Sequence, residues 1–208
     1  QVCAMEVSSH ALEQRRIAGL QFVARVFTNL TQDHLDYHKT MHAYFASKKK
    51  LFTDYGADGL SVINVDDAYG RELFEKLHGR KLSYGTSESA ELRATNVLVS
   101  VQGIRFDLNL EAETYPVTAP LVCHFNVSNI LAALGVVRQL GVPLAQAIDR
   151  LSSFPGVPGR MQRIGGQSAI PVFVDYAHTP DAMENVLSDV RALFPGVIIT
   201  VFGCGGDR

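Results

Sequence analysis

The sequence predicts an α/β protein with a mostly parallel sheet flanked by helices, a small antiparallel β insert and the start of a second α/β unit. Short apolar runs typical of buried strands alternate with segments of helical period, as in parallel sheets with right-handed crossovers. Between Leu92 and Thr118 polar and apolar residues alternate instead, which indicates two or three antiparallel strands. The Pro- and Gly-rich segment Phe154–Arg160 is the clearest linker, so we set the domains at 1–157 and 158–208.

The first predicted strand is the apolar run Val2–Val7, which only Glu6 interrupts. Ser8 or Ser9 then serves as the N-cap of a helix that continues to about residue 20. A carboxylate at the end of an apolar strand is costly unless a cation or hydrogen bonds compensate it. Glu6 is therefore either an exposed strand terminus or linked to a metal, and we favour the metal.

The segment from Thr28 to Phe52 carries the densest group of chemically active side chains. An apolar strand ending at Phe27 precedes it, and helical spacing begins at Met41. Two acids and two histidines fall within six positions: Asp33, His34, Asp36 and His38. Imidazole and carboxylate are ordinary ligands of zinc or a similar divalent metal, at a strand end where ligands bind. A merely solvated or capped loop is the alternative that the spacing leaves open.

The remaining elements follow in order. We expect strands at Leu60–Val65, Met161–Ile164, Val172–Asp175 and Val197–Phe202, and helices after Asp66, at Cys123–Leu140, at Pro143–Leu151 and at about 181–193. Turns are expected at Gly103 and Glu113–Tyr115. Asn126 and Asn129 lie near a helix start, where either can be a cap. The glycine turn after Phe202 suits close approach of the backbone to an anion.

Composition excludes several classes of protein. The chain has 208 residues, 47% of them hydrophobic, and a formal net charge of -2, so we expect neither a nucleic-acid partner nor a membrane partner. Three scattered cysteines, Cys3, Cys123 and Cys204, are too few for a disulfide framework or a four-thiolate zinc site. We read them as buried thiols in a reducing cytoplasm, where we expect a monomer.

Seven motifs in a fixed order carry a family resemblance: MEVSSHAL, TNLTQDHLDYH, YFASKKKLF, HFNVSNILAAL, PGRMQ, VDYAHTPDAMENVL and VFGCGGDR. The chain resembles the Mur ligases of peptidoglycan synthesis, over nearly its whole length. Within that family it looks most like the ligases that add the third amino acid to UDP-N-acetylmuramoyl-L-alanyl-D-glutamate. The resemblance implies a central ATP-binding domain of the P-loop type and the start of a Rossmann-like C-terminal domain.

The same resemblance implies that the metal is magnesium rather than zinc. Glu6 and His34 would be its ligands, directly or through water, and Lys48 would be a carbamylated lysine. Addition of CO2 turns an ammonium group, which cannot bind a cation, into an oxygen donor of the kind that magnesium prefers. Lys49 and Lys50 remain a solvated basic face.

Further roles carried over from the family concern the two substrates. Ser8, Gln14 and Arg16 would hold the UDP-muramoyl dipeptide. The nucleotide-binding residues would be Asn126, Asn129, Arg160, Asp175, Tyr176 and His178, with Arg160 at the γ-phosphate of ATP. Lys48, Arg160 and His34 would be the catalytic residues, and a salt bridge within the linker is the alternative interpretation of Arg160.

The implied activity is an ATP-dependent amide ligation that adds meso-diaminopimelate or L-lysine through an acyl phosphate. The family's G-x-x-G-K-T loop and its Asp-Asn-Pro-Arg stretch are not in this sequence, so we expect an inactive fragment of an active ligase. Three alternatives stay open: another amide ligase of this type, a two-metal hydrolase built on a carbamylated lysine, and a non-catalytic module that binds nucleotide or a partner.

Overall fold

The computed structural model describes residues 2–31, 35–55, 58–165 and 170–203. The chain divides into two compact units, the first made of Gln1–Arg93 and Leu131–Val142, the second of Ala94–Ile130 and Pro143–Arg208. This division does not follow the linker at Phe154–Arg160. The domain boundary at residue 157 therefore stays a prediction.

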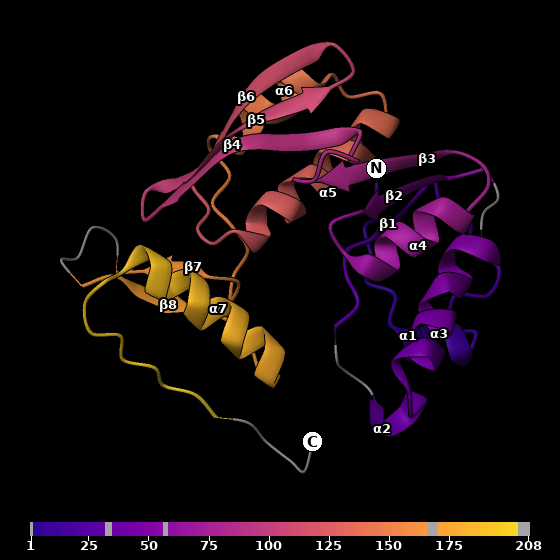
Figure 1. The fold of residues 1–208 in the computed structure, drawn as a ribbon, viewed down its shortest axis with the longest axis horizontal. Coiled ribbons are helices and arrows are strands. Elements are labelled where there is room, and N and C mark those ends of the chain that lie inside the picture. Colours follow the sequence, from indigo (N-terminus) through magenta and orange to yellow (C-terminus); the bar gives the residue numbers. More distant parts are fainter. Residues whose placement is uncertain (1, 32–34, 56–57, 166–169, 204–208) are drawn as a thin grey trace. The chain divides into compact units, whose positions relative to one another are not determined.

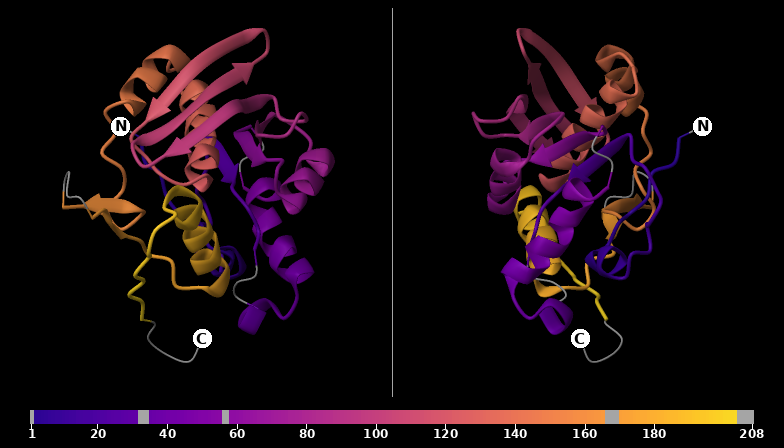
Figure 2. Two further views of the ribbon diagram at one scale, coloured as in Figure 1. Left: turned by 60° about the vertical axis from the view of Figure 1, so that its left-hand side comes forward. Right: turned by 90° about the vertical axis from the view of Figure 1, so that its right-hand side faces the viewer.

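Six strands follow one another in chain order within one sheet (Figure 1). They are β1 (Ala24–Phe27), β2 (Leu60–Asn64), β3 (Lys81–Gly85), β4 (Leu92–Ser100), β5 (Gly103–Leu110) and β6 (Glu113–Ala119). The pairs β1–β2, β2–β3 and β3–β4 are parallel. The pair β5–β6 is antiparallel, and its two strands run side by side in both views of Figure 2. The predicted mostly parallel sheet with an antiparallel part is confirmed.

The first unit contains α1 (Ser9–Glu13), α2 (Leu35–His38), α3 (Met41–Thr53) and α4 (Ala68–Lys76). Side chains cap the starts of three of them. Ser8, Thr40 and Asp67 each accept a hydrogen bond from the backbone amide three residues on, at the starts of α1, α3 and α4 respectively. The predicted cap at Ser8 is confirmed, whereas the cap at Thr40 was not foreseen.

The core of the first unit lies between β1, β2 and the helices α3 and α4. Phe27 of β1 meets Phe45 and Phe52 of α3 edge to face, with ring centroids 6.3 and 6.1 Å apart. Ile63 of β2 and Leu73 of α4 belong to the same buried cluster. Every position of β2 is buried, Ser61 and Asn64 included, which identifies it as a central strand.

The second unit contains the hairpin β5–β6 and the start of α5 (Phe125–Gln139), up to Ile130. It also contains α6 (Leu144–Leu151), α7 (Pro180–Leu193) and the antiparallel pair of β7 (Gln162–Ile164) and β8 (Val172–Val174). Buried Val122, Cys123 and Met161 form a small core with Phe173 and one face of α7. The carboxylate of Asp189 on α7 accepts a hydrogen bond from the backbone N–H of His124 at 2.7 Å and approaches Nδ1 of the same residue at 3.0 Å. These contacts seat α7 on the start of α5.

Two predicted strands are wrong. Val2–Val7 and Val197–Phe202 have no regular structure, and most of their apolar side chains are exposed, with Val2 at 76% and Val201 at 93%. An apolar run becomes a strand only when a neighbouring strand satisfies its backbone groups. Within the described residues, neither segment pairs with one.

Smaller differences concern ends and turns. Helix α1 ends at Glu13, well before residue 20, and Arg15 follows with φ 53°. The hairpin turn lies at Glu111, where φ is 56°, whereas Glu113–Tyr115 already belongs to β6. Strand β3 was not predicted, because KLSYG places a buried serine, Ser83, inside a short run. In a central strand such a residue breaks the apolar signal.

Candidate functional site

The carboxyl ends of β1, β2 and β3 lie at one edge of the sheet, because these strands are parallel. The chain leaving β1 passes through residues 28–31 at this edge and leads toward α2. Asp33, His34 and the side chain of Asp36 lie outside the described residues. The candidate site is therefore built from the side chains around this loop.

Lys48 extends from α3 to the loop. Its Nζ donates a hydrogen bond to the carbonyl oxygen of Asn29 at 3.4 Å and lies 5.1 Å from the centroid of the Tyr44 ring. Lys50, two residues on, instead binds Glu13 of α1, with Nζ 2.8 Å from both carboxylate oxygens. This hydrogen bond holds the pKa of Glu13 below its ordinary value. Lys48 is thus directed at the loop, whereas Lys50 is directed at α1. The carbamylation of Lys48 stays a prediction.

His38, the last residue of α2, is buried rather than available as a ligand. Its Nε2 is hydrogen-bonded to Oγ of Ser9 at 2.8 Å, and its ring stacks on Tyr44 with centroids 5.0 Å apart. His38, which the sequence placed in the predicted cation cluster, therefore has a structural role in this fold.

Glu6 lies exposed on the irregular segment before α1. Among the residues that the structure describes, no three His, Cys, Asp or Glu side chains are grouped as a metal site. The convergence of Glu6, His34 and Lys48 accordingly stays a prediction.

The predicted substrate residues lie around α1. Oγ of Ser8 accepts the amide of Ala11 at 3.2 Å, so this hydroxyl caps the helix. Gln14 and Arg16 are exposed and joined, with Nε of Arg16 donating to Oε1 of Gln14 at 2.8 Å. The structure therefore brings Gln14 and Arg16 together as one polar pair just beyond the helix end.

Four predicted nucleotide residues lie together in the second unit. The guanidinium carbon of Arg160 is 4.8 Å from the Tyr176 ring centroid, and that ring meets the ring of His178 edge to face at 4.9 Å. The carboxylate of Asp175 accepts the amides of Met161 at 2.7 Å and Ala177 at 2.8 Å. Each carboxylate oxygen can still accept a second hydrogen bond. This grouping was implied by the resemblance and not by spacing, since Arg160 precedes Asp175 by 15 positions.

Asn126 and Asn129 lie in the first two turns of α5 and contact one another. Asn126 Nδ2 donates to the carbonyl of Val122 at 2.7 Å, and Asn129 Nδ2 donates to Oδ1 of Asn126 at 3.0 Å. Buried Cys123 precedes them with φ 73°, and burial raises the pKa of this thiol to about 12. The thiol therefore stays protonated and inert near neutral pH.

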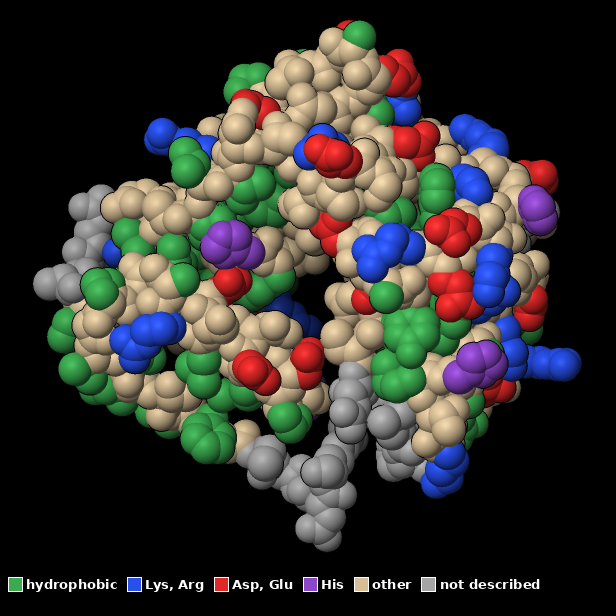
Figure 3. Space-filling view, viewed as in Figure 1, with side chains coloured by type: hydrophobic (Ala, Val, Ile, Leu, Met, Phe, Trp, Pro, Cys, Tyr) green, Lys and Arg blue, Asp and Glu red, His purple; other side chains and the backbone are tan. Residues whose placement is uncertain are grey.

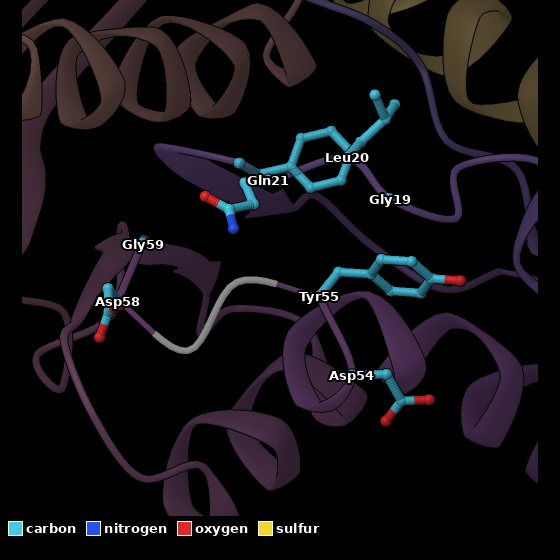
Figure 4. A pocket seen from close by; sticks show the side chains of 8 residues that line it. Gly19, Leu20, Gln21, Asp54, Tyr55, Asp58 and Gly59 are labelled. Carbon is cyan, nitrogen blue, oxygen red and sulfur yellow. The ribbon is translucent and has the colours of Figure 1, made fainter.

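A separate cavity of about 420 Å³ lies at the opposite end of the strands, between the segments that enter β1 and β2. Figure 4 shows Gln21 and Tyr55 on these two segments, with Asp54 and Asp58 nearby. Beneath it, buried Arg25 donates to the carbonyls of Phe52, Tyr55 and Gly59 at 3.1, 2.8 and 2.6 Å. These bonds hold the entry to β2 and explain why an arginine is buried in β1.

Comparison with known proteins identifies the family. Residues 1–137 match the profile of the Mur ligase middle domain, and residues 159–208 match that of the Mur ligase glutamate ligase domain. The chain belongs to the Mur ligase family. This Mur ligase chain is 47% identical over 207 residues to a UDP-N-acetylmuramoyl-L-alanyl-D-glutamate--2,6-diaminopimelate ligase of Thermosynechococcus vestitus. It is 49% identical over 210 residues to the enzyme of that name from Geobacter sulfurreducens.

The Mur ligase chain covers 98% of its own length in both alignments but only 42% and 41% of these two relatives. A solved UDP-N-acetylmuramoyl-L-alanyl-D-glutamate--2,6-diaminopimelate ligase shares 37% identity with a TM-score of 0.76, over 97% of this chain and 42% of that one. The MurF ligase of Thermotoga maritima, solved with ADP, is 19% identical with a TM-score of 0.72, over 88% of this chain and 42% of that one. That second likeness concerns the fold alone.

Acidic and basic side chains are interspersed on the face drawn in Figure 3. None of the helices in the described part of the chain is long and apolar enough to cross a membrane.

Sequence reasoning missed the side chains that contact the 28–31 loop from β2, β3 and α4. Asn64, Asp67 and Tyr84 each form a hydrogen bond with the backbone near this loop. The only signal was the polar stretch Asn64–Asp67 directly after a buried strand, which we read as the acidic start of a helix.

Proposed function

We propose that this chain is part of an ATP-dependent ligase that joins 2,6-diaminopimelate to UDP-N-acetylmuramoyl-L-alanyl-D-glutamate. The observation that supports this most is the identity of 47% and 49% with two relatives of that name over 98% of the chain. These names favour diaminopimelate over lysine, which the sequence motifs alone left open. Because ATP and UDP-linked precursors are cytoplasmic compounds, the proposed place of action is the cytoplasm.

The residues proposed for the cation site suit magnesium by their chemistry. Glu6 offers a carboxylate, and Lys48, once carbamylated, offers two further oxygens, which are the donors that this hard cation prefers. Carbamylation of the ammonium group adds CO2 and releases two protons, so Nζ keeps one hydrogen and can still donate to the carbonyl of Asn29. Glu6, His34 and Lys48 would hold the ion, which supplies neutralisation of phosphate charge.

The remaining roles fall to this chain's own side chains. Arg160, held against Tyr176, carries a fixed positive charge suited to the γ-phosphate of ATP. Asp175 would accept the ribose hydroxyls, with His178, Asn126 and Asn129 as further nucleotide contacts. The pair of Gln14 and Arg16, with Ser8 at the helix start, would bind the anionic UDP-linked dipeptide.

The proposed reaction has two steps. A carboxylate oxygen of the D-glutamate attacks the γ-phosphorus of ATP, ADP leaves and an acyl phosphate forms. The amine of diaminopimelate then attacks the acyl carbon, phosphate leaves, and the nitrogen loses a proton to give the amide. Binding and charge neutralisation carry most of this catalysis, since phosphoryl transfer needs little covalent help from the protein.

Release of ADP by the natural protein that carries these residues tests the proposal. We expect ADP release to require both the UDP-linked dipeptide and diaminopimelate. ADP release that needs neither would indicate a nucleotide hydrolase, and tight nucleotide binding without turnover would indicate a non-catalytic module. As a control, we expect the 208-residue chain alone to be inactive, since its relatives are more than twice as long.

A further inference from the structure

Four consecutive residues at the end of β1 are each held through a backbone group by a side chain from elsewhere in the first unit. Tyr84 O–H donates to the carbonyl of Phe27 at 3.2 Å, and Asn64 Nδ2 donates to that of Thr28 at 2.7 Å. Lys48 Nζ donates to the carbonyl of Asn29 at 3.4 Å, and Oδ2 of Asp67 accepts the amide of Leu30 at 3.1 Å. We call Phe27–Leu30 the held segment.

The four contacts come from four different elements. Tyr84 belongs to β3, Asn64 ends β2, Asp67 caps α4 and Lys48 lies in α3. Strand pairing does not require any of these side-chain bonds. A loop that only connected two elements would more commonly satisfy its backbone groups with water.

Tyr84 is a permanent donor in this arrangement. Its side chain is fully buried at 0% exposure, and this burial, with Asp66 and Asp67 nearby, raises the pKa of the phenol well above its ordinary value. The hydroxyl therefore keeps its proton throughout the working range of pH. Asn64 is equally constrained, because its Oδ1 accepts the amide of Asp66 at 3.0 Å while its Nδ2 holds Thr28.

Asp67 joins two elements with its two oxygens. Oδ1 accepts the amide of Gly70 at 2.9 Å and so caps α4, while Oδ2 binds Leu30. A serine or asparagine at this position would cap the helix comparably well. Only the carboxylate supplies two acceptors at once, so capping alone does not explain the residue.

The held segment is where Lys48 reaches the loop, and it precedes His34 in the sequence. We infer that Asn64, Asp67 and Tyr84 are positioning residues, which fix the carbonyl of Asn29 for Nζ of Lys48 and anchor the residues that come before the proposed metal ligand His34. The inference rests on the proposed roles of Lys48 and His34. In other enzymes, displacing a reacting group by about 1 Å through a distant substitution can lower the rate by on the order of a hundredfold.

Two variants separate this role from helix capping and core packing. Asp67→Ser keeps an N-cap oxygen for Gly70 but is too short to reach Leu30 as well. Tyr84→Phe keeps the buried ring and removes only the hydroxyl. Asp66→Asn and Tyr115→Phe are matched controls, because Asp66 binds Thr86 and Ser87 and Tyr115 binds Glu113, none of which belongs to the held segment.

Three readouts apply to the natural protein that carries this chain: hydrogen exchange of the Leu30 amide, affinity for Mn2+ alone, and the ligation rate with its dependence on magnesium. For both variants we expect Mn2+ affinity and kcat to fall about tenfold, with KM for the UDP-linked dipeptide within about twofold. In Asp67→Ser the Leu30 amide should also exchange faster, while the Gly70 amide stays protected. The controls should leave all three readouts unchanged.

Two outcomes overturn the inference. In one, the variants lower the melting temperature while Mn2+ affinity and kcat per folded molecule stay at the wild-type values, which would make the contacts purely structural. In the other, the exchange of Leu30 in Asp67→Ser is unchanged. Absence of ligation by the unaltered protein would count against the proposed function alone, because amide exchange and Mn2+ binding are measured without turnover.

Discussion

Nε2 of His38 lies 2.8 Å from Oγ of Ser9, and this buried hydrogen bond joins α2 to α1. The same imidazole stacks on Tyr44 of α3 at an interplanar angle of 18°. One side chain thus ties together the helix that begins at the predicted substrate residue Ser8, the helix that follows His34, and the helix that carries Lys48.

His38→Ala should lower the free energy of unfolding by about 3 kcal/mol, because it leaves a cavity and a buried Ser9 hydroxyl with one partner fewer. Urea denaturation measures this. The control is His78→Ala, an exposed histidine, for which we expect a change within about 0.5 kcal/mol. Equal effects of the two substitutions would contradict a structural role for His38.

Asp66 makes part of the stability dependent on pH. Burial raises the pKa of its carboxyl, but hydrogen bonds from Thr86 and Ser87 outweigh burial and hold that pKa below its ordinary value near 3.8. Because folding favours the charged form, this stability is present above about pH 5 and is lost as pH falls through 3.8 toward the folded-state pKa. Asp66→Asn should therefore lose less stability than wild type between pH 5 and pH 3.

Acid titrations of the unfolding free energy, monitored by circular dichroism, check this difference. Glu88→Gln is a suitable control, since Glu88 is 92% exposed on its side chain and lies 3.9 Å from Arg93. If the unfolding free energies of wild type and Asp66→Asn fell in parallel with falling pH, Asp66 would not be the source of this pH dependence.

Arg160→Lys should raise KM for ATP about tenfold, because lysine keeps the charge but loses the planar stack on Tyr176 and the bidentate geometry. Steady-state kinetics at varied ATP measures this. Arg163→Lys, an exposed arginine on β7, is the matched control and should leave KM unchanged. A normal KM for ATP in Arg160→Lys would remove Arg160 from the nucleotide site.

Lys48→Ala should abolish ligation, with a loss of at least about a hundredfold, because no carbamate can form. A small carboxylate such as acetate should restore part of the rate by supplying the missing oxygens. Lys49→Ala is the control, since Lys49 is the next lysine of α3 and no role in the cation site is proposed for it. Full activity of Lys48→Ala in CO2-depleted buffer would rule out the carbamate.

The sequence predicts elements well where periodicity is strong and a partner is present. The helix from Met41 and the strand from Leu60 appear where their apolar spacing predicts them. Val2–Val7 and Val197–Phe202 carry an equally strong apolar signal, but a strand also needs a neighbour, which the residues' own pattern does not encode. β3 is the opposite case, a strand with a weak apolar signal. Its buried Ser83 is tolerated because the hydroxyl donates a hydrogen bond to the carboxylate of Glu91 at 2.9 Å.

In the candidate site, too, some residues were predicted from the sequence and others were found only in the structure. Arg160, Asp175, Tyr176 and His178 were grouped by family motifs, and the fold brings them together. The contacts of Asn64, Asp67 and Tyr84 with the held segment connect residues up to 57 positions apart. Such contacts depend on strand register, which no local pattern specifies, so they emerge only from the three-dimensional structure.

The mass of the product formed by the natural protein tests the central claim most directly. With ATP, magnesium and UDP-N-acetylmuramoyl-L-alanyl-D-glutamate, the account predicts a new product whose mass equals the dipeptide substrate plus diaminopimelate minus water, with one ADP released per product. Lysine in place of diaminopimelate should give little product. ADP release without any amide product, or no reaction with either amino acid, would contradict the account.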